Sequence, residues 1–192
     1  MAVKDDLPIL AFPTAAAWET WLTKEHATSA GLWLKIAKKS SDIPTVTYAE
    51  ALDVALCYGW IDGQKSSFDN DYFLQRFTPR RSRSKWSKIN CVKVEALMEA
   101  GKMKPAGLAQ VEAAKADGRW DAAYASQSTA EVPEDFAKAL SENKTAREFF
   151  DTLSKSQRYP FLYRIQDAKR PETRQRRIAQ FVEMLAEQRL LR

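Results

Sequence analysis

Residues 47–64 read TYAEALDVALCYGWIDGQ, a helix signal followed directly by a strand signal. Thr47 and Glu50 have the spacing of a capping box, in which a hydroxyl and a carboxylate bind free amides at a helix start. Gly59 is placed to end this helix, and residues 60–64 then favour a strand. The apolar positions of the predicted helix follow helical spacing: Ala51, Leu52, Ala55 and Leu56.

Two further segments predict strands that complete a small sheet. Residues 32–37 (LWLKIA) are apolar on both faces of a predicted strand, and residues 72–77 (YFLQRF) predict another. The polar residues 66–71 favour a hairpin between the last two strands. Upstream, Thr14 is placed to cap a helix with three apolar residues on one face: Trp18, Trp21 and Leu22.

The rest of the chain favours helices. Ser84 is predicted to cap a helix over residues 84–100, and Ser154 has the spacing of a capping box, although Pro160 predicts a kink or a later start near Tyr159. Other predicted helices cover 105–117 and 133–140, begin at Asn143 or Thr145, and open at Pro171. We therefore expect an α+β protein with N-terminal helices on a small antiparallel sheet (1–100), followed by an all-helical half (101–192), packed as one globule.

Composition limits the class of protein. A chain of 192 residues with 45% hydrophobic content can bury a stable core without disulfide bonds or structural metal ions. Residues 3–8 lack a basic start and an apolar run, and no stretch approaches the roughly 20 apolar residues of a membrane span, so we expect a cytoplasmic location and no membrane anchor. Cys57, Cys91 and the single His26 predict no disulfide framework, metal site or cofactor. The oligomeric state stays open.

Charge placement gives the main functional lead. The net charge is +5, and six basic residues with no acid fall within residues 76–88. If Ser84 caps a helix here, its free amides point toward several guanidinium groups, an arrangement that suits an anion. Asp62, between two glycines, lies where a ligand can approach closely. The predicted site binds a small anionic ligand or an acidic partner through these residues: Asp62, Gln64, Arg76, Arg80, Arg83, Ser84, Trp86 and Asn90.

Other interpretations remain open. In a purely structural one, Asp62 pairs with Arg76, the tryptophans are core and the other arginines form a solvated loop. A second basic group is interpreted as a solvated helix face paired with Glu172 and Asp167: Arg170, Arg174 and Arg177. Weak nucleic-acid binding would use phosphate contacts with stacking on Phe77 and Trp86.

An enzyme acting on an anionic small molecule is the third hypothesis. It would use Asp62 as a general base or Cys57 as a nucleophile. Cys57 falls in the apolar stripe of a predicted helix, which favours a core role. No glycine-rich phosphate loop, zinc pattern or nucleophile elbow supports an enzyme.

Several motifs in order resemble the YdeI/OmpD-associated family, also labelled bacteriocin-protection proteins. They are GLWL at 31–34, YAEALDVALCYGWIDG at 48–63, RFTPR at 76–80, WSKIN at 86–90 and AKRPETR at 168–174. The resemblance implies a small bacterial cytoplasmic protein with a mixed N-terminal part and a helical C-terminal part, and it transfers no catalytic residue. A positively charged protein does not attract cationic antimicrobial peptides, so the resemblance implies only an indirect protective role.

Overall fold

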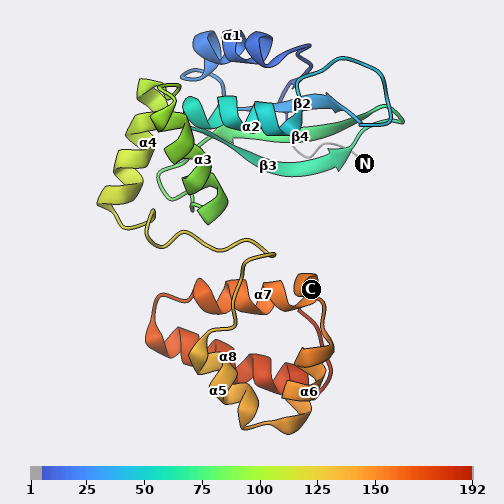
Figure 1. The fold of residues 1–192 in the computed structure, drawn as a ribbon, viewed down its shortest axis with the longest axis vertical. Coiled ribbons are helices and arrows are strands. Elements are labelled where there is room, and N and C mark those ends of the chain that lie inside the picture. Colours follow the sequence, from blue (N-terminus) through green and yellow to red (C-terminus); the bar gives the residue numbers. More distant parts are fainter. Residues whose placement is uncertain (1–5, 192) are drawn as a thin grey trace. The chain divides into compact units, whose positions relative to one another are not determined.

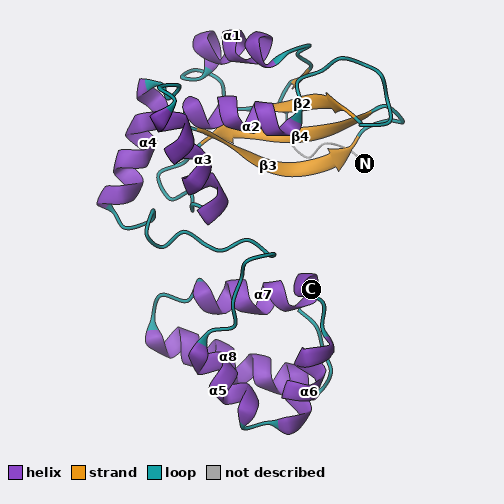
Figure 2. Ribbon diagram, viewed as in Figure 1, coloured by secondary structure: helices purple, strands orange, loops and turns teal. Residues whose placement is uncertain are grey.

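The computed structural model describes residues 6–191, so the start of the N-terminal segment interpreted above lies outside the described residues. Within that range the chain forms eight helices and one four-stranded sheet, with the strands in the N-terminal half (Figure 2). The predicted α+β class is therefore confirmed. No described helix is both long and apolar enough to cross a membrane.

The sheet has the order β1-β2-β4-β3. Its strands are β1 (Ile9–Leu10), β2 (Leu32–Ala37), β3 (Trp60–Ser67) and β4 (Tyr72–Pro79). β1 is parallel to β2, and the other pairs are antiparallel. The prediction for β2 is confirmed at both ends, β3 and β4 are longer than predicted, and β1 was not predicted because two residues show no period.

Two helices cover one face of the sheet (Figure 1). These are α1 (Ala15–Glu25) and α2 (Tyr48–Cys57), and both predicted caps are present. Thr14 Oγ1 accepts a hydrogen bond from Ala17 N at 3.2 Å, and Thr47 and Glu50 form the full capping box. Gly59 follows α2 with φ +75°, a left-handed conformation that favours glycine and turns the chain into β3.

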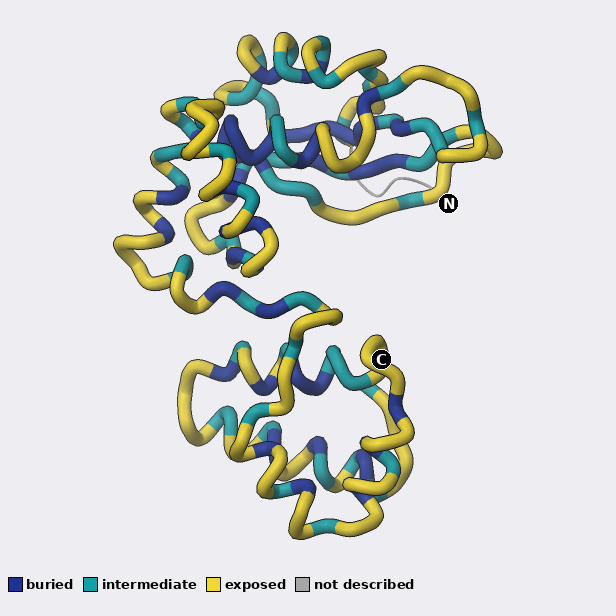
Figure 3. Tube along the Cα trace, viewed as in Figure 1, coloured by how far each residue is buried: buried dark blue, intermediate teal, exposed yellow. Residues whose placement is uncertain are grey.

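Aromatic rings join these helices to the sheet. Trp18 of α1 lies 5.8 Å from Phe77 of β4 between ring centroids and 6.2 Å from Trp60 of β3. Both indole N–H groups find backbone acceptors, since Trp18 Nε1 donates to Ala51 O and Trp60 Nε1 donates to His26 O, each at 3.1 Å. The three rings are almost fully buried. Figure 3 shows that buried residues gather along β2 and β4.

Two helices follow β4, namely α3 (Lys88–Glu99) and α4 (Pro105–Ala116). The prediction that Ser84 caps α3 is wrong, because α3 begins at Lys88 and Ser84 Oγ accepts from Arg81 N instead. α4 approaches the end of α2 so closely that a Cβ on Gly107 would lie 2.2 Å from Cys57 O. Glycine is therefore required at this contact.

The C-terminal helices form a separate core. They are α5 (Glu134–Ser141), α6 (Lys144–Thr152), α7 (Lys155–Gln166) and α8 (Pro171–Ala186). Asn143 caps α6, and Ser154 with Gln157 forms a capping box on α7. Pro160 lies inside α7, so the predicted later start near Tyr159 is wrong. The apolar centre includes Phe136, Phe150, Phe161, Ile165 and Phe181.

The chain divides into two compact units. Unit 1 comprises the described residues up to Trp86 together with Asn90–Ala122, and unit 2 comprises Ser87–Ile89 and the chain from Ala123 onward. The boundary between the compact units thus lies after α4. The sequence analysis placed the boundary between the mixed part and the helical part near residue 100. The packing of both parts as one globule stays a prediction.

The α2–α4 contact predicts the effect of filling it. Gly107→Ala should lower the free energy of unfolding by about 2 kcal/mol, because the added methyl group overlaps a backbone oxygen that cannot move alone. Gly63→Ala is the control, since its nearest neighbour would be 3.6 Å away, and it should change stability by less than about 0.5 kcal/mol. Urea denaturation measures both, and equal effects would contradict the tight contact.

Candidate functional site

Residues 80–86 form a tight basic loop between β4 and α3. Arg81 N donates to Ser84 Oγ and Ser84 N donates to Arg81 O, both at 2.9 Å, which closes the turn on itself. Arg80 N donates to Gly59 O at 2.9 Å and ties the loop to the end of α2. The loop is therefore held by its own hydrogen bonds rather than by a helix cap.

Arg80 lies inside this loop rather than on its surface. The residue is 6% exposed, and its guanidinium carbon lies 3.6 Å from the ring centroid of Trp86. Arg80 Nη1 donates to Lys85 O at 3.2 Å, and Trp86 packs in turn on Trp120 at 4.9 Å. This geometry makes Arg80 and Trp86 an internal support of the loop.

Exposed cations lie on the outside of the same loop. Arg81, Arg83 and Lys85 are all exposed. The sequence prediction missed Arg119, whose Nη1 donates to Ser84 O at 3.0 Å while its Nε binds Asp117 at 2.7 Å. Only the fold brings residue 119 to residue 84, and no local motif could have indicated it.

The other predicted site residues lie elsewhere. Asp62 is opposite Phe77 in the β3–β4 register, and its carboxylate accepts from Tyr48 Oη at 2.8 Å, so the interpretation that pairs it with Arg76 is wrong. Arg76 is opposite Trp33, one position along β4 from Phe77, and so belongs to the other face of the sheet. The structure therefore brings together Arg80, Ser84 and Trp86 but not all eight predicted residues.

Two further predicted residues have structural surroundings. Gln64 is exposed and lies in an irregular step of β3, where the register shifts between Asp62 and Lys65. Gln75 Nε2 donates to Gly63 O at 2.9 Å and to Gln64 O at 3.3 Å, which satisfies carbonyl groups at this step. Asn90 lies on α3 and is 9% exposed.

A pocket of about 520 Å³ lies where β2 ends, beside β3 and β4, beneath the loop of residues 38–47. We call it the strand-end pocket. It is lined by three lysines, four hydroxyl side chains and apolar groups: Lys38, Lys39, Lys65, Ser41, Thr45, Thr47, Tyr48, Ile36, Ala37, Ile43 and Phe73. None of the described residues that line it is Asp or Glu. The strand-end pocket is thus cationic with partly apolar walls.

The lysines of this pocket differ in their contacts. Lys38 Nζ donates to Asp69 O at 2.7 Å, whereas Lys65 Nζ lies 4.2 Å from the ring centroid of Phe73. Lys39 is exposed. The sequence prediction assigned residues 38–42 only to a polar loop and did not connect them with Lys65. Lys65 lies near this loop only because β2 pairs with β4 and β4 pairs with β3.

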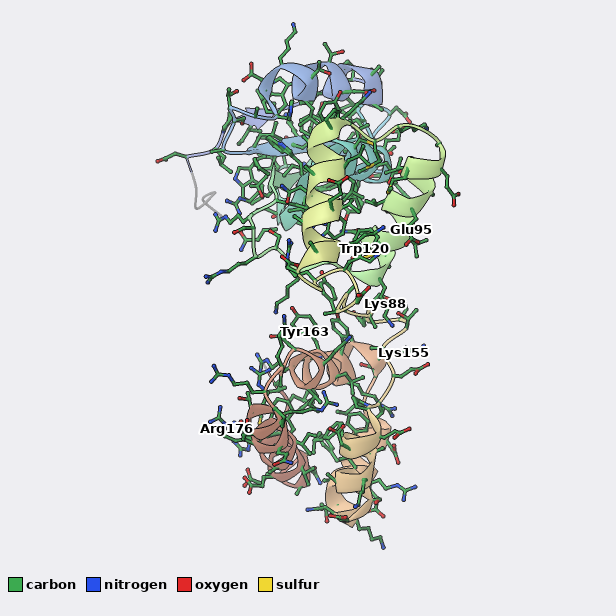
Figure 4. All side chains as sticks on the ribbon, turned by 90° about the vertical axis from the view of Figure 1, so that its left-hand side faces the viewer. Lys88, Glu95, Trp120, Lys155, Tyr163 and Arg176 are labelled. Carbon is green, nitrogen blue, oxygen red and sulfur yellow. The ribbon has the colours of Figure 1, made fainter. Side chains whose placement is uncertain are left out.

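The second basic group lies in unit 2. Arg174 of α8 forms two hydrogen bonds to Asp135 of α5, at 2.6 and 2.8 Å, so its predicted pairing with nearby acids of its own segment is wrong. Arg177 donates to Arg164 O, which joins α8 to α7. Arg176 is exposed on the outer side of α8 (Figure 4).

The cysteines have core environments. Cys57 and Cys91 are free and buried. Burial raises the pKa of each thiol to about 11, which keeps both protonated and weakly nucleophilic near neutral pH. The part of the chain that the structure describes also contains no group of three or more His, Cys, Asp or Glu side chains placed to hold a metal ion.

Each unit contains a region that matches a known family model. Residues 10–110 match the model of the family described as Domain of unknown function (DUF8412), and residues 129–188 match the one described as Bacteriocin-protection, YdeI or OmpD-Associated. The sheet unit and the helical unit thus each correspond to a known domain class. The chain belongs to the DUF8412 family, whose model covers more than half of it, and its C-terminal unit carries the YdeI/OmpD-associated domain.

The predicted resemblance to the YdeI/OmpD-associated family is confirmed by the C-terminal match. The motifs quoted between residues 31 and 90 fall within the region matched by the DUF8412 model. No curated protein and no solved structure matches the chain.

The burial of Arg80 predicts effects of different size on stability for two arginines of the basic loop. Arg80→Ala should destabilise the protein by about 2 kcal/mol, because it removes the packing over Trp86 and a hydrogen bond to Lys85 O. Arg83→Ala, at an exposed position, should change stability by less than about 0.5 kcal/mol. Urea denaturation followed by tryptophan fluorescence compares them; a neutral Arg80→Ala would contradict the internal support.

The Arg174–Asp135 pair predicts a pH-dependent contribution to unit 2. Hydrogen bonds from Arg174 lower the pKa of Asp135 from its ordinary value. The ionised pair therefore stabilises the fold fully above the unfolded-state pKa of about 3.9 and loses this effect as the pH falls through the lower folded-state pKa. Asp135→Asn should cost at most about 1 kcal/mol at pH 7, since the pair is partly exposed.

Thermal unfolding between pH 7 and pH 2 measures this difference. The gap between the wild type and Asp135→Asn should narrow as the pH falls below about 4. Glu134→Gln, at an exposed neighbouring acid on α5, is the control for general charge effects. A gap that stays constant with pH would contradict a contribution from the ionised pair.

Proposed function

We propose that unit 1 binds a small anionic ligand in the strand-end pocket. The observation that carries the proposal is the lining of this pocket, which has three lysines and no carboxylate among the described residues. Like charges gathered in a concave site raise the local positive potential, and an anion relieves their repulsion. The volume of about 520 Å³ lies within the range of ordinary small-molecule sites.

The rim of the pocket supports the proposal because it is already fixed. Thr45 Oγ1 accepts from Ala37 N at 2.9 Å and holds the loop of residues 38–47 against the end of β2. Tyr48 Oη donates to Asp62 Oδ2. Asp62, which the sequence analysis predicted to contact the ligand, thus holds Tyr48 in place at the rim. A preformed rim lowers the conformational entropy lost on binding.

The alternative functions have less support. Phe77 and Trp86 are 0% and 2% exposed, so neither ring offers a free face to a stacked base. Cys57 is buried, and its raised pKa disfavours a nucleophilic role. The basic loop has exposed arginines, so binding of an acidic partner at this loop is the second candidate function. Two free thiols support a reducing compartment such as the cytoplasm as the proposed location.

A thermal-shift comparison tests the proposed function with inorganic phosphate, acetate and benzoate as probes. At a concentration of 100 times its dissociation constant, a bound probe adds about 2.7 kcal/mol of stability, a shift of roughly 5 to 10 °C for a chain of this size. Replacing both Lys39 and Lys65 by Gln should remove the shift. Lys24→Gln, at an exposed lysine of α1 away from the pocket, should leave it unchanged.

The basic loop supplies the discriminating variant. Replacing both Arg81 and Arg83 by Gln should preserve the thermal shift if the strand-end pocket is the site. Loss of the shift in this variant, with the Lys39 and Lys65 variant unaffected, would move the site to the basic loop and overturn the proposal. Absence of a shift with all three probes would also overturn it.

A further inference from the structure

Resting on the proposed function, we infer the chemical class of the ligand: a carboxylate attached to a flat or branched apolar body, rather than a free phosphate. The size of the pocket favours a ligand larger than a free phosphate. The strand-end pocket holds about 520 Å³, whereas about 10 to 15 Å³ of such space is enough to hold one water. A bare phosphate or acetate would leave most of this space to solvent, and only a larger molecule would contact several walls together.

The walls of the strand-end pocket are partly apolar. Ile36 of β2 is buried at the base, and Phe73 of β4 lies beside it. Ile43 and Tyr48 at the rim keep 38% and 39% of their surface exposed, which is high for large apolar side chains. An apolar ligand body that covers these two residues would remove apolar surface from water on both sides of the contact.

Several hydrogen-bond donors at the pocket already have partners within the protein. Phosphate sites in proteins commonly gather several free backbone N–H groups. Here three of the backbone N–H groups at the pocket are already used: Ala37 N by Thr45 Oγ1, Lys38 N by Asp71 O and Ser41 N by Lys38 O. The ammonium group of Lys38 is bound to Asp69 O. The side-chain ammonium groups of Lys39 and Lys65 can still meet the two oxygens of a carboxylate.

The position of Lys65 links the charged and apolar parts of the site. Its Nζ lies 4.2 Å from the ring centroid of Phe73, so a cation and an aromatic wall are adjacent. A ligand whose carboxylate is attached directly to a flat ring matches this adjacency. A carboxylate with a long polar linker does not.

Isothermal titration calorimetry with acetate, benzoate, benzyl alcohol and inorganic phosphate tests this inference. Benzoate should bind at least about tenfold more tightly than acetate, because only benzoate buries apolar surface. Benzyl alcohol, which has the ring without the charge, should bind at least about tenfold more weakly than benzoate.

Two variants separate the contributions of wall and charge. Ile43→Ser should weaken benzoate several-fold and leave acetate unchanged, whereas Lys65→Gln should weaken both. Ile43 and Lys39 are both exposed, so substitutions at these positions should leave the fold intact. Lys39→Gln is therefore the second charge variant if Lys65→Gln fails to fold. Lys24→Gln is again the control.

The outcomes distinguish the inference from the proposed function. If phosphate binds with a Lys65-dependent affinity equal to or above that of benzoate, the ligand class is wrong while anion binding at this pocket stands. If acetate and benzoate bind equally, the apolar body is wrong in the same way. If none of the charged probes binds, both the ligand class and the proposed function are overturned.

Discussion

Antiparallel pairing of β2 with β4 is the contact on which the architecture of unit 1 depends. It joins residues 32–37 to residues 72–77 in one register, which places Leu32 opposite Phe77 and Ile36 opposite Phe73. At one end of the pair, Phe77 contacts Trp18 of α1, which in turn contacts Trp60 at the start of β3. At the other end, Phe73 and Ile36 form part of the strand-end pocket. A shift of one residue would reverse the faces and remove both features.

This arrangement places the aromatic core and the proposed binding site at different ends of the β2–β4 pair. The end near Phe77 is filled by large buried rings, among which the indole N–H groups of Trp18 and Trp60 donate to backbone oxygens. Arg80 packs on Trp86 in the basic loop that follows β4. At the end near Phe73, three lysines line the strand-end pocket. The proposed site therefore lies at the end of the sheet away from these rings, and the buried part of the basic loop, Arg80 with Trp86, supports the fold.

Local signals in the sequence predicted most of the elements. The caps at Thr14, Thr47 and Ser154 and the run of β2 are short-range features, and the structure contains each of them. Ser84 misled the prediction because a serine before a basic helix resembles a cap, whereas its hydroxyl accepts a hydrogen bond within a turn. β1 could not be predicted, since its two residues are defined only by Trp33 and Leu34 of β2.

The candidate site was less predictable for the same physical reason. Charge density along the chain indicated residues 76–88, but burial of Arg80 and the partner of Asp62 depend on contacts between distant segments. Lys39 and Lys65 line the same pocket only because β2 pairs with β4 and β4 pairs with β3. The sequence alone therefore suggested an anionic ligand. The fold was needed to select which lysines and arginines of the chain form the proposed site.

The most direct test of this account is an NMR titration of the ¹⁵N-labelled protein with benzoate. The account predicts saturable amide shifts for residues 36–48 and for Lys65 and Phe73, while residues 80–86 and the helices of unit 2 stay unchanged. Shifts centred on residues 80–86, or none that saturate, would contradict an anion site at the strand ends.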